Sequence, residues 1–539
     1  MAQSIETMPI ANWSVVEAST QGANVLPSEV IRFTIPQELG YVDFHTSYLQ
    51  LELQVTNANY KMALNGNCGA EVLIDSLRIY LDSGEILEEI TAYNQLCEIL
   101  VDYGKNYEER HFKGVLNNQA GNSRYDPGLF GDGAVSMTGA NKVVKVCIPL
   151  SASGFFSNRQ VAPLILLGNV TVEVKLAEAT RCLKVHMPGN VFEANSGIGS
   201  EIACRNQYTT EPTTAAVGQT FVALRPPYCS FNGIADCPIV TGMQFKLCSV
   251  AVGGTPPIAS MRDITCTSLS LDDNGRIRVN FAATNFTGGG ATQKKLVIGT
   301  GTDGVQDVAT TTSYQVTRAD LILQQVQPPA QYTQGLIAQA GGQGYEMDIE
   351  TFVNYKANLS ATVPTQTLEI PCFNSRCRSV ITCLRPSTQT VNWGGGGALD
   401  GTADRGTFNA NLFNWEGLYE NLQQYQLSIG DKREPVRPVV LNTMLGLHQH
   451  NSQEHLIEIS KALHSAGVNV NSLEKARENF CLGRSLSKYG SSMSLVAEGL
   501  RWYVEYQNAT YPQVALTPET YVSVIRRVVV DKDGVQVYG

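Results

Sequence analysis

The chain alternates between apolar and polar residues in many short stretches, a pattern that predicts β-strands buried on one face. The most regular stretch, residues 142–176, predicts two buried strands joined by a polar loop. Its apolar positions are Val144, Val146, Ile148, Val170, Val172 and Val174. A weaker pattern of the same order returns at residues 480–507. We therefore interpret residues 142–176 as core and scaffold, with no chemistry of their own.

One helix interrupts the strands of the first half, after the strand patterns at residues 30–36, 47–55 and 72–87. Thr91 is its expected N-cap, and Gly104 is the residue expected to end it. The expected buried face consists of Leu96, Ile99, Leu100 and Tyr103. A polar loop at about residues 105–141 then leads into the stretch described above.

A second series of elements starts near Pro364 and follows the same order. Residues 367–371 (TLEIP) resemble residues 32–36 (RFTIP), and a strand follows each. A second helix is expected after Asn451, with Glu454 in the capping-box position and an end at Gly467. Leu456, Ile459 and Leu463 form its apolar face, and a hairpin turning at Asp533-Gly534 closes the chain. The order of three strands, a helix, a strand pair and a strand thus occurs twice.

This composition of elements predicts an all-β dominated fold of antiparallel sandwiches rather than alternating strands and helices. The expected limits are an N-terminal arm at 1–28, a first sandwich at 29–360 and a second at 361–539. Residues 180–312 are expected to be a β-rich insertion in the first sandwich, containing a hairpin with Asn274-Gly275 at its turn. Two unrelated β-domains remain the alternative to a repeat.

Composition restricts the class of protein. The 539 residues are 43% hydrophobic and 16% charged, as expected of a well-buried globular protein. The net charge is −10 and no Lys or Arg precedes Arg32, which argues against a basic nucleic-acid-binding arm. No secretory signal is expected, and the strongest apolar run, residues 161–167, is too short to span a bilayer. Most of the 13 cysteines, including Cys147, Cys248, Cys266 and Cys383, lie in apolar runs and are expected to be buried free thiols in a reducing compartment.

Four patterns could suggest a chemical site. Residues 299–304 form a GxGxxG, but the helix-poor sequence after it does not suit a dinucleotide site. His448, His450 and His455 precede or begin the second helix and are expected to be solvated or helix-capping residues. Asp272 and Asp273 are expected in a hairpin tip, and shared metal ligation by Cys372, Cys377 and Cys383 is not expected, because Cys383 falls within a strand. No catalytic, cofactor-binding or metal-binding residue is predicted.

The strand blocks at residues 31–36, 47–55, 145–176, 480–487, 500–506 and 526–538 resemble those of double jelly-roll major capsid proteins of tailless icosahedral DNA viruses, of the virophage or polinton-like type. The resemblance implies two tandem eight-stranded jelly rolls and no enzymatic activity. It implies a homotrimeric capsomer of pseudo-hexagonal outline in an icosahedral virion, assembled in the cytoplasm or nucleus of a host cell. Neighbouring capsomers, penton proteins and minor capsid or cement proteins are the expected partners, without sequence-specific binding of nucleic acid.

Residues 105–141 and 180–312 are the candidates for the outward crown, where a host receptor could bind, and residues 1–28 for an inner arm. One alternative is a glycan- or receptor-binding β-sandwich protein, such as a spike or lectin. Against it, Trp13, Trp393, Trp415 and Trp502 are scattered along the chain and do not suggest an aromatic platform. A second alternative is an enzyme with its site in the insertion.

Overall fold

The computed structural model describes most of the two predicted sandwiches and part of the insertion. The described residues are 10–19, 24–56, 62–64, 68–105, 143–185, 192–193, 202–203, 207–209, 213–214, 219–223, 241, 244–251, 262–271, 277–284, 291–298, 313–387, 390–392, 411–413, 417, 422–441, 453–470, 479–487, 491–507, 512 and 515–539. Within these ranges, no helix is long and apolar enough to cross a membrane.

The first sandwich consists of two antiparallel sheets. Sheet A has the strand order β1 (Ile10–Glu17), β20 (Ser313–Gln327), β3 (Tyr41–Thr56) and β7 (Val143–Ile148). Sheet B has the order β2 (Val30–Ile35), β9 (Val170–Leu176), β5 (Ile74–Leu81) and β6 (Ile86–Thr91). The alternate residues that face between the sheets are buried, so the interior is an apolar layer of the kind expected between stacked sheets.

The second sandwich repeats this plan. Its sheet A is β21 (Tyr345–Lys356), β30 (Leu516–Asp531), β23 (Cys377–Pro386) and β28 (Cys481–Ser485). Its sheet B is β22 (Thr365–Ile370), β29 (Leu500–Tyr506), β26 (Leu422–Ile429) and β27 (Lys432–Val440). When the eight strands of each sandwich are numbered along the chain, both have the orders 1-8-3-6 and 2-7-4-5. The prediction of two eight-stranded antiparallel jelly rolls is thus confirmed.

The repeated blocks in the sequence occupy equivalent strands. Residues 32–35 lie in β2 and residues 367–370 in β22, and both strands are second in their sandwich. Each sandwich also has one longer helix between its fifth and sixth strands, α1 (Tyr93–Gly104) in the first and α8 (Gln453–Ser465) in the second. Gly467 follows α8 with a φ of 79°, the left-handed conformation that favours glycine at a helix end.

The predicted limits differ from the structure at both ends of the first sandwich. Residues 10–17 of the expected arm form β1, which pairs along its length with β20. Residues 1–9 and 20–23 lie outside the described residues. At the other end, β21 begins at Tyr345 and already belongs to the second sandwich. The change of sandwich therefore falls between β20 and β21, at helix α7 (Ala330–Gly342), and not near residue 360.

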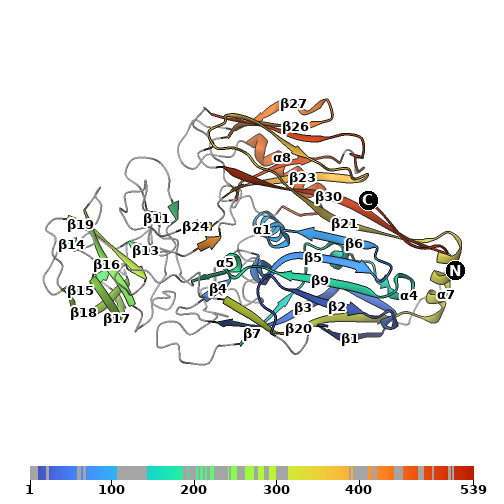
Figure 1. Cartoon of the computed structure of the whole chain (residues 1–539), viewed down its shortest axis with the longest axis horizontal. Coiled ribbons are helices and arrows are strands. Elements are labelled where there is room, and N and C mark those ends of the chain that lie inside the picture. Colours follow the sequence, from blue (N-terminus) through green and yellow to red (C-terminus); the bar gives the residue numbers. More distant parts are fainter. Residues whose placement is uncertain are drawn as a thin grey trace.

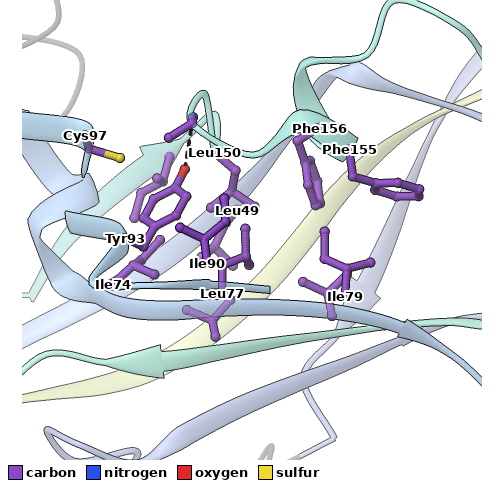
Figure 2. Packing of buried hydrophobic residues seen from close by; sticks show 14 of the residues in the cluster. Leu49, Ile74, Leu77, Ile79, Ile90, Tyr93, Cys97, Leu150, Phe155 and Phe156 are labelled. Atoms are coloured by element: carbon purple, nitrogen blue, oxygen red, sulfur yellow. Dashed lines mark hydrogen bonds between the residues drawn. The ribbon is translucent and has the colours of Figure 1, made fainter. Parts of the chain in front are cut away.

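The stretch 142–176 is confirmed as core, although its two strands, β7 and β9, lie in opposite sheets of the first sandwich. The loop between them is less polar than expected, because it contains the short helix α3 (Gly154–Ser157) with Phe155 and Phe156 buried. Figure 2 shows these two rings beside Leu49 and Ile79, and the Phe44 and Phe155 centroids are 4.5 Å apart. This segment therefore fills one end of the sandwich.

One predicted feature of the first helix is wrong and another is incomplete. The N-cap of α1 is Ala92, in the left-handed conformation, whereas Thr91 is the last residue of β6. Nearly all of α1 is buried and not only one face, because the helix lies between the two sandwiches in Figure 1. Figure 2 shows Tyr93 of α1 among core residues, with its hydroxyl accepting a hydrogen bond from the Ala152 N–H at 3.3 Å.

The β-rich insertion forms a separate sheet at the end of the molecule opposite α7 and the C-terminus (Figure 1). Its strands are β13 (Gln207–Thr209), β14 (Thr213–Thr214), β15 (Gln219–Ala223), β16 (Gln244–Ala251), β17 (Arg262–Leu271), β18 (Ile277–Thr284) and β19 (Ala291–Ile298). The predicted hairpin is β17–β18, and its turn at Asn274-Gly275 lies outside the described residues.

Smaller elements complete the described chain. The short strand pairs are β4 (Met62–Leu64) with β10 (Leu183–Val185), β11 (Phe192–Glu193) with β12 (Ile202–Ala203), β24 (Thr390–Asn392) with β25 (Asn411–Phe413), β8 (Ala162–Pro163) with β3, and β31 (Gly534–Tyr538) with β30. The short helices are α4 (Leu164–Leu167), α5 (Ala179–Cys182), and the 3₁₀ turns at Gln37–Leu39 and Gly69–Leu73.

Candidate functional site

The contact between the two sandwiches is the most extensive functional candidate in the described chain. Alternate residues of β23 belong to different cores: Val380 and Leu384 to the core of the second sandwich, Ile381 and Cys383 to the core that includes the first. Met347 and Ile349 of β21 join the same core as Ile381. The outward face of the second sheet A is therefore buried against the first sandwich.

The first sandwich contributes its fifth strand β6, helix α1 and helix α3 to this contact, and several hydrogen bonds cross it. The Tyr521 hydroxyl donates to the Ala92 carbonyl at 3.0 Å, and the Tyr103 hydroxyl donates to the Asn479 carbonyl at 2.7 Å. The Asn479 side-chain amide donates to Asp102 at 2.9 Å. Because these polar groups are buried, each bond satisfies a group that water cannot reach. The two sandwiches are thus fixed side by side.

Glu88 of β6 is a fully buried carboxylate at the same contact. It accepts hydrogen bonds from the Gly154 N–H at 2.7 Å, the Phe155 N–H at 3.3 Å and the Ser153 hydroxyl. Burial raises the pKa of the Glu88 carboxyl, while these hydrogen bonds act in the opposite direction. The carboxylate holds α3 against β6, which is a structural role.

The outward face of the second sheet A forms one side of this contact. The equivalent face on the first sandwich is exposed. The outward face of its sheet A presents Trp13 and Val15 on β1, which is the first strand of its sandwich as β21 is of the second. Trp13 is 57% exposed and Val15 is 54% exposed. The register places Val15 beside Ile322, which lies beside Tyr48, and the Trp13 and Tyr48 rings meet edge to face at 6.2 Å. We call these four residues the sheet A patch.

The other half has an exposed counterpart on the second sandwich. The elements equivalent to β6, α1 and the α3 loop are β27, α8 and the connection between β28 and β29. They expose Val436 (95% exposed), Val440, Ile457 and Val496, which we call the β27–α8 patch. Pro435 and Pro438 on the edge strand β27 disfavour pairing of another strand there. The patch therefore suits side-chain packing, as at the internal contact.

The sequence did not single out either patch. Trp13 and Val15 fall in the segment interpreted as an arm, which the structure shows to contain strand β1. The β27–α8 patch could not be found from the sequence, because its residues are scattered along the chain and belong to elements whose equivalence follows from the fold.

The candidate chemical groups do not converge in the described part of the chain, where no cluster of three or more His, Cys, Asp or Glu side chains could hold a metal ion. His455 is buried, contrary to the expectation of a solvated or capping residue. Its Nδ1 lies 2.9 Å from the Tyr425 hydroxyl, its ring stacks on Phe480, and desolvation lowers its pKa to about 3. His448, His450, Asp272, Asp273 and residues 299–304 lie outside the described residues.

The predictions for the cysteines and tryptophans agree more closely with the structure than the prediction for His455. The nine cysteines whose side chains the structure describes are free, and all but Cys147 are buried. Cys383 lies apart from Cys372 and Cys377, in the core shared with the first sandwich. Trp502 is buried and donates to the Thr382 hydroxyl at 2.9 Å, far from a surface platform. Trp393 and Trp415 lie outside the described residues.

No protein-family model and no curated protein matches the chain. Among solved structures, the chain is similar to VP54 of PBCV-1, fitted into a reconstruction of the virophage Sputnik, with a TM-score of 0.49, 8% identity, and coverage of 99% of this chain and 98% of that one. It is similar to the Faustovirus major capsid protein with a TM-score of 0.48, 10% identity, and coverage of 98% and 92%. For the mavirus major capsid protein the TM-score is 0.34, with 9% identity and coverage of 97% and 89%. Each of these matches spans most of both chains.

Proposed function

We propose that the chain is the structural subunit of a viral capsid, which assembles as homotrimers that tile an icosahedral shell. The observation that carries the proposal is the internal contact between two sandwiches of identical strand order. The elements on both sides of that contact have equivalents in the other sandwich, and these equivalents carry exposed apolar residues. A second copy of the chain is the occupant that this repetition fits.

The contact between copies is head to tail: the β27–α8 patch of one chain covers the sheet A patch of the next. Such a heterologous interface closes into a ring when the rotation that relates one copy to the next divides 360° into a whole number of steps. Three chains supply six similar sandwiches, which gives a trimer a pseudo-hexagonal outline. We take the number of chains in the ring, three, from the resemblance to double jelly-roll capsid proteins. The positions of the two patches support the head-to-tail arrangement of the contact.

The position of the insertion supports an orientation in the shell. Its sheet lies at the end of the molecule opposite α7 and the C-terminus. The long axes of both sandwiches run between these two ends (Figure 1). We assign the insertion to the outward crown, where it would meet a host receptor, and the α7 end to the interior. Penton proteins and minor capsid or cement proteins remain the proposed further partners in the virion.

The net charge of −10 supports a shell that does not bind its genome directly through this chain. The buried reduced cysteines are compatible with assembly inside a host cell. The proposal assigns no catalytic activity to the chain.

Native mass spectrometry of the purified full-length protein tests the proposal. The expected species has a mass of about 175 kDa, three times the 58.5 kDa of one chain. Negative-stain electron microscopy of the same sample should show particles of hexagonal outline. A protein that stays monomeric at every concentration would contradict the proposal, and binding of such a monomer to immobilised glycans would favour the spike or lectin alternative.

A further inference from the structure

Cys372 and Cys377 form a close pair of thiols at the turn between β22 and β23. Their sulfur atoms are 3.8 Å apart, and both side chains lie in the core of the second sandwich. Asn374 lies between them: its side-chain amide donates to the Cys372 sulfur at 3.3 Å, and its backbone carbonyl oxygen lies 3.4 Å from the Cys377 sulfur. The Tyr355 hydroxyl also bonds to Cys372. Several donors thus converge on one sulfur atom.

The turn between these cysteines anchors several distant segments. The Asn374 carbonyl accepts from the Leu495 N–H at 2.9 Å, and the Arg376 carbonyl accepts from the Ile525 N–H at 2.9 Å. The Ser375 hydroxyl donates to the C-terminal residue Gly539 at 2.7 Å. A covalent link across the turn would therefore restrain the connection between β28 and β29, strand β30 and the chain end together.

We propose that Cys372 and Cys377 are an oxidation site, at which a peroxide converts the two thiols into a disulfide that staples this turn. In the first step the Cys372 thiolate sulfur attacks a peroxide oxygen, the O–O bond breaks, and Cys372 becomes a sulfenic acid as hydroxide leaves and is protonated to water. The Cys377 sulfur then attacks the Cys372 sulfur, the S–O bond breaks, and a second water leaves. Two thiols thus supply the two electrons that reduce one peroxide to two waters.

The assignment of the attacking sulfur follows from the hydrogen bonds. Cys372 accepts them, and the bond from Cys377 together with those from Asn374 and Tyr355 lowers the pKa of Cys372 to about 6. Cys377 donates, and its pKa is raised for the same reason and by burial. The thiolate is the reactive form towards peroxide, so Cys372 is the attacking residue and Cys377 the resolving one. The sulfurs need to approach to about 2 Å to form the bond.

Cys147 provides an internal comparison, because it is the described cysteine that is half-exposed rather than buried. If exposure alone governed oxidation, Cys147 would react first. We expect Cys372 to lose its thiol about tenfold faster than Cys147 at pH 7, because the hydrogen bonds to the Cys372 sulfur stabilise its thiolate. This inference stands independently of the proposed capsid function.

The experiment treats the full-length protein with hydrogen peroxide, blocks the remaining thiols with iodoacetamide and digests it with trypsin without reduction. Trypsin cleaves after Lys356, Arg376 and Arg378, so the disulfide joins peptide 357–376 to the dipeptide 377–378. We expect this cross-linked product to form before Cys147 is modified and to disappear on reduction. Recovery of both cysteines in alkylated form at a dose that oxidises Cys147 would overturn the proposal.

Two single variants test the order of the steps. In Cys377→Ser, the sulfenic acid on Cys372 has no resolving thiol and should be captured by dimedone. In Cys372→Ser, Cys377 should give no dimedone adduct at the same dose. Equal labelling of the two variants would mean that the pair has no attacking and resolving member, which contradicts the mechanism.

Discussion

Gly154 of α3 lies directly on the backbone of Glu350 in β21, so closely that a Cβ atom on Gly154 would stand 1.8 Å from the Glu350 carbonyl oxygen. Helix α3 belongs to the first sandwich and β21 to the second. The contact is therefore between two backbones across the internal interface, and neither can move aside as a side chain would. Glycine is required at position 154 because of space.

Replacing Gly154 by Ala should destabilise the protein by about 3 kcal/mol, because the added methyl group forces the sandwiches apart locally. Urea unfolding followed by tryptophan fluorescence measures the effect. Gly341→Ala is the matched control: nothing lies within 4 Å of its Cβ position in helix α7, and we expect a gain of about 0.5–1 kcal/mol. Wild-type stability of Gly154→Ala would contradict the close contact.

Val172 tests the core of the first sandwich. It is fully buried in β9, paired with Phe33 on one side and Ile79 on the other. Val172→Asp places a carboxylate without a partner in an apolar core, at a cost of several kcal/mol. We expect little soluble protein and no trimer, measured by fractionation and native mass spectrometry. Val363→Asp, at a partly exposed position, should remain soluble; full recovery of soluble Val172→Asp trimer would contradict the strand assignment.

The strands that were predicted well are those that bury one face and expose the other. Val170, Val172 and Val174 repeat every second residue because only one face of β9 meets the core. Strand β1 was missed because its outward face carries Trp13 and Val15, so its alternation does not separate apolar from polar residues. An exposed apolar face obscures the signal on which strand prediction depends.

The interfaces were less accessible to prediction from the sequence, for a physical reason. Tyr103 and Asn479 are 376 residues apart, and only the packing of one sandwich on the other brings them together. His455 could have been recognised, since it lies one turn before Ile459 on the face that α8 buries. Its burial was missed because histidine is compatible with both a core and a surface position.

His455 should make stability depend on pH. Its pKa falls from an ordinary 6.5 to about 3 in the folded protein. Below pH 6.5 the unfolded chain therefore binds a proton that the folded chain does not, and this group lowers the free energy of unfolding by about 1.4 kcal/mol per pH unit until about pH 3. Above pH 6.5 the group has no effect.

The measurement compares urea midpoints at pH 7 and pH 5 for wild type and His455→Gln, in which the glutamine can still accept from Tyr425. The variant should lose about 2 kcal/mol less than wild type over this interval. The charges of Glu454, Glu458 and Arg484 also act on the Tyr425 hydroxyl. Each variant is therefore measured at both pH values, so that its own pH dependence is compared with that of wild type. His464→Gln, at an exposed position of the same helix, is the control and should follow wild type. An unchanged pH dependence in His455→Gln would mean that His455 is not neutral when folded.

The two exposed patches allow a test of the proposed head-to-tail contact. Trp13→Glu places a charge in the sheet A patch and Val436→Glu places one in the β27–α8 patch, without touching either core. A buried aromatic anchor is worth about 2 kcal/mol or more at an interface, and a carboxylate there adds a desolvation cost. We expect each variant alone to be a folded monomer. Val30→Glu, at an exposed position of the other sheet, should still form trimers.

Mixing the two variants distinguishes the proposed contact from a symmetric one. Trp13→Glu retains an intact β27–α8 patch and Val436→Glu retains an intact sheet A patch, so the pair can form one wild-type interface but cannot close a ring. We expect a species of about 117 kDa, twice the 58.5 kDa chain, on native mass spectrometry of the mixture only. Trimers that persist in both single variants would contradict the face assignment and leave the capsid proposal standing, whereas a monomeric wild type would contradict both.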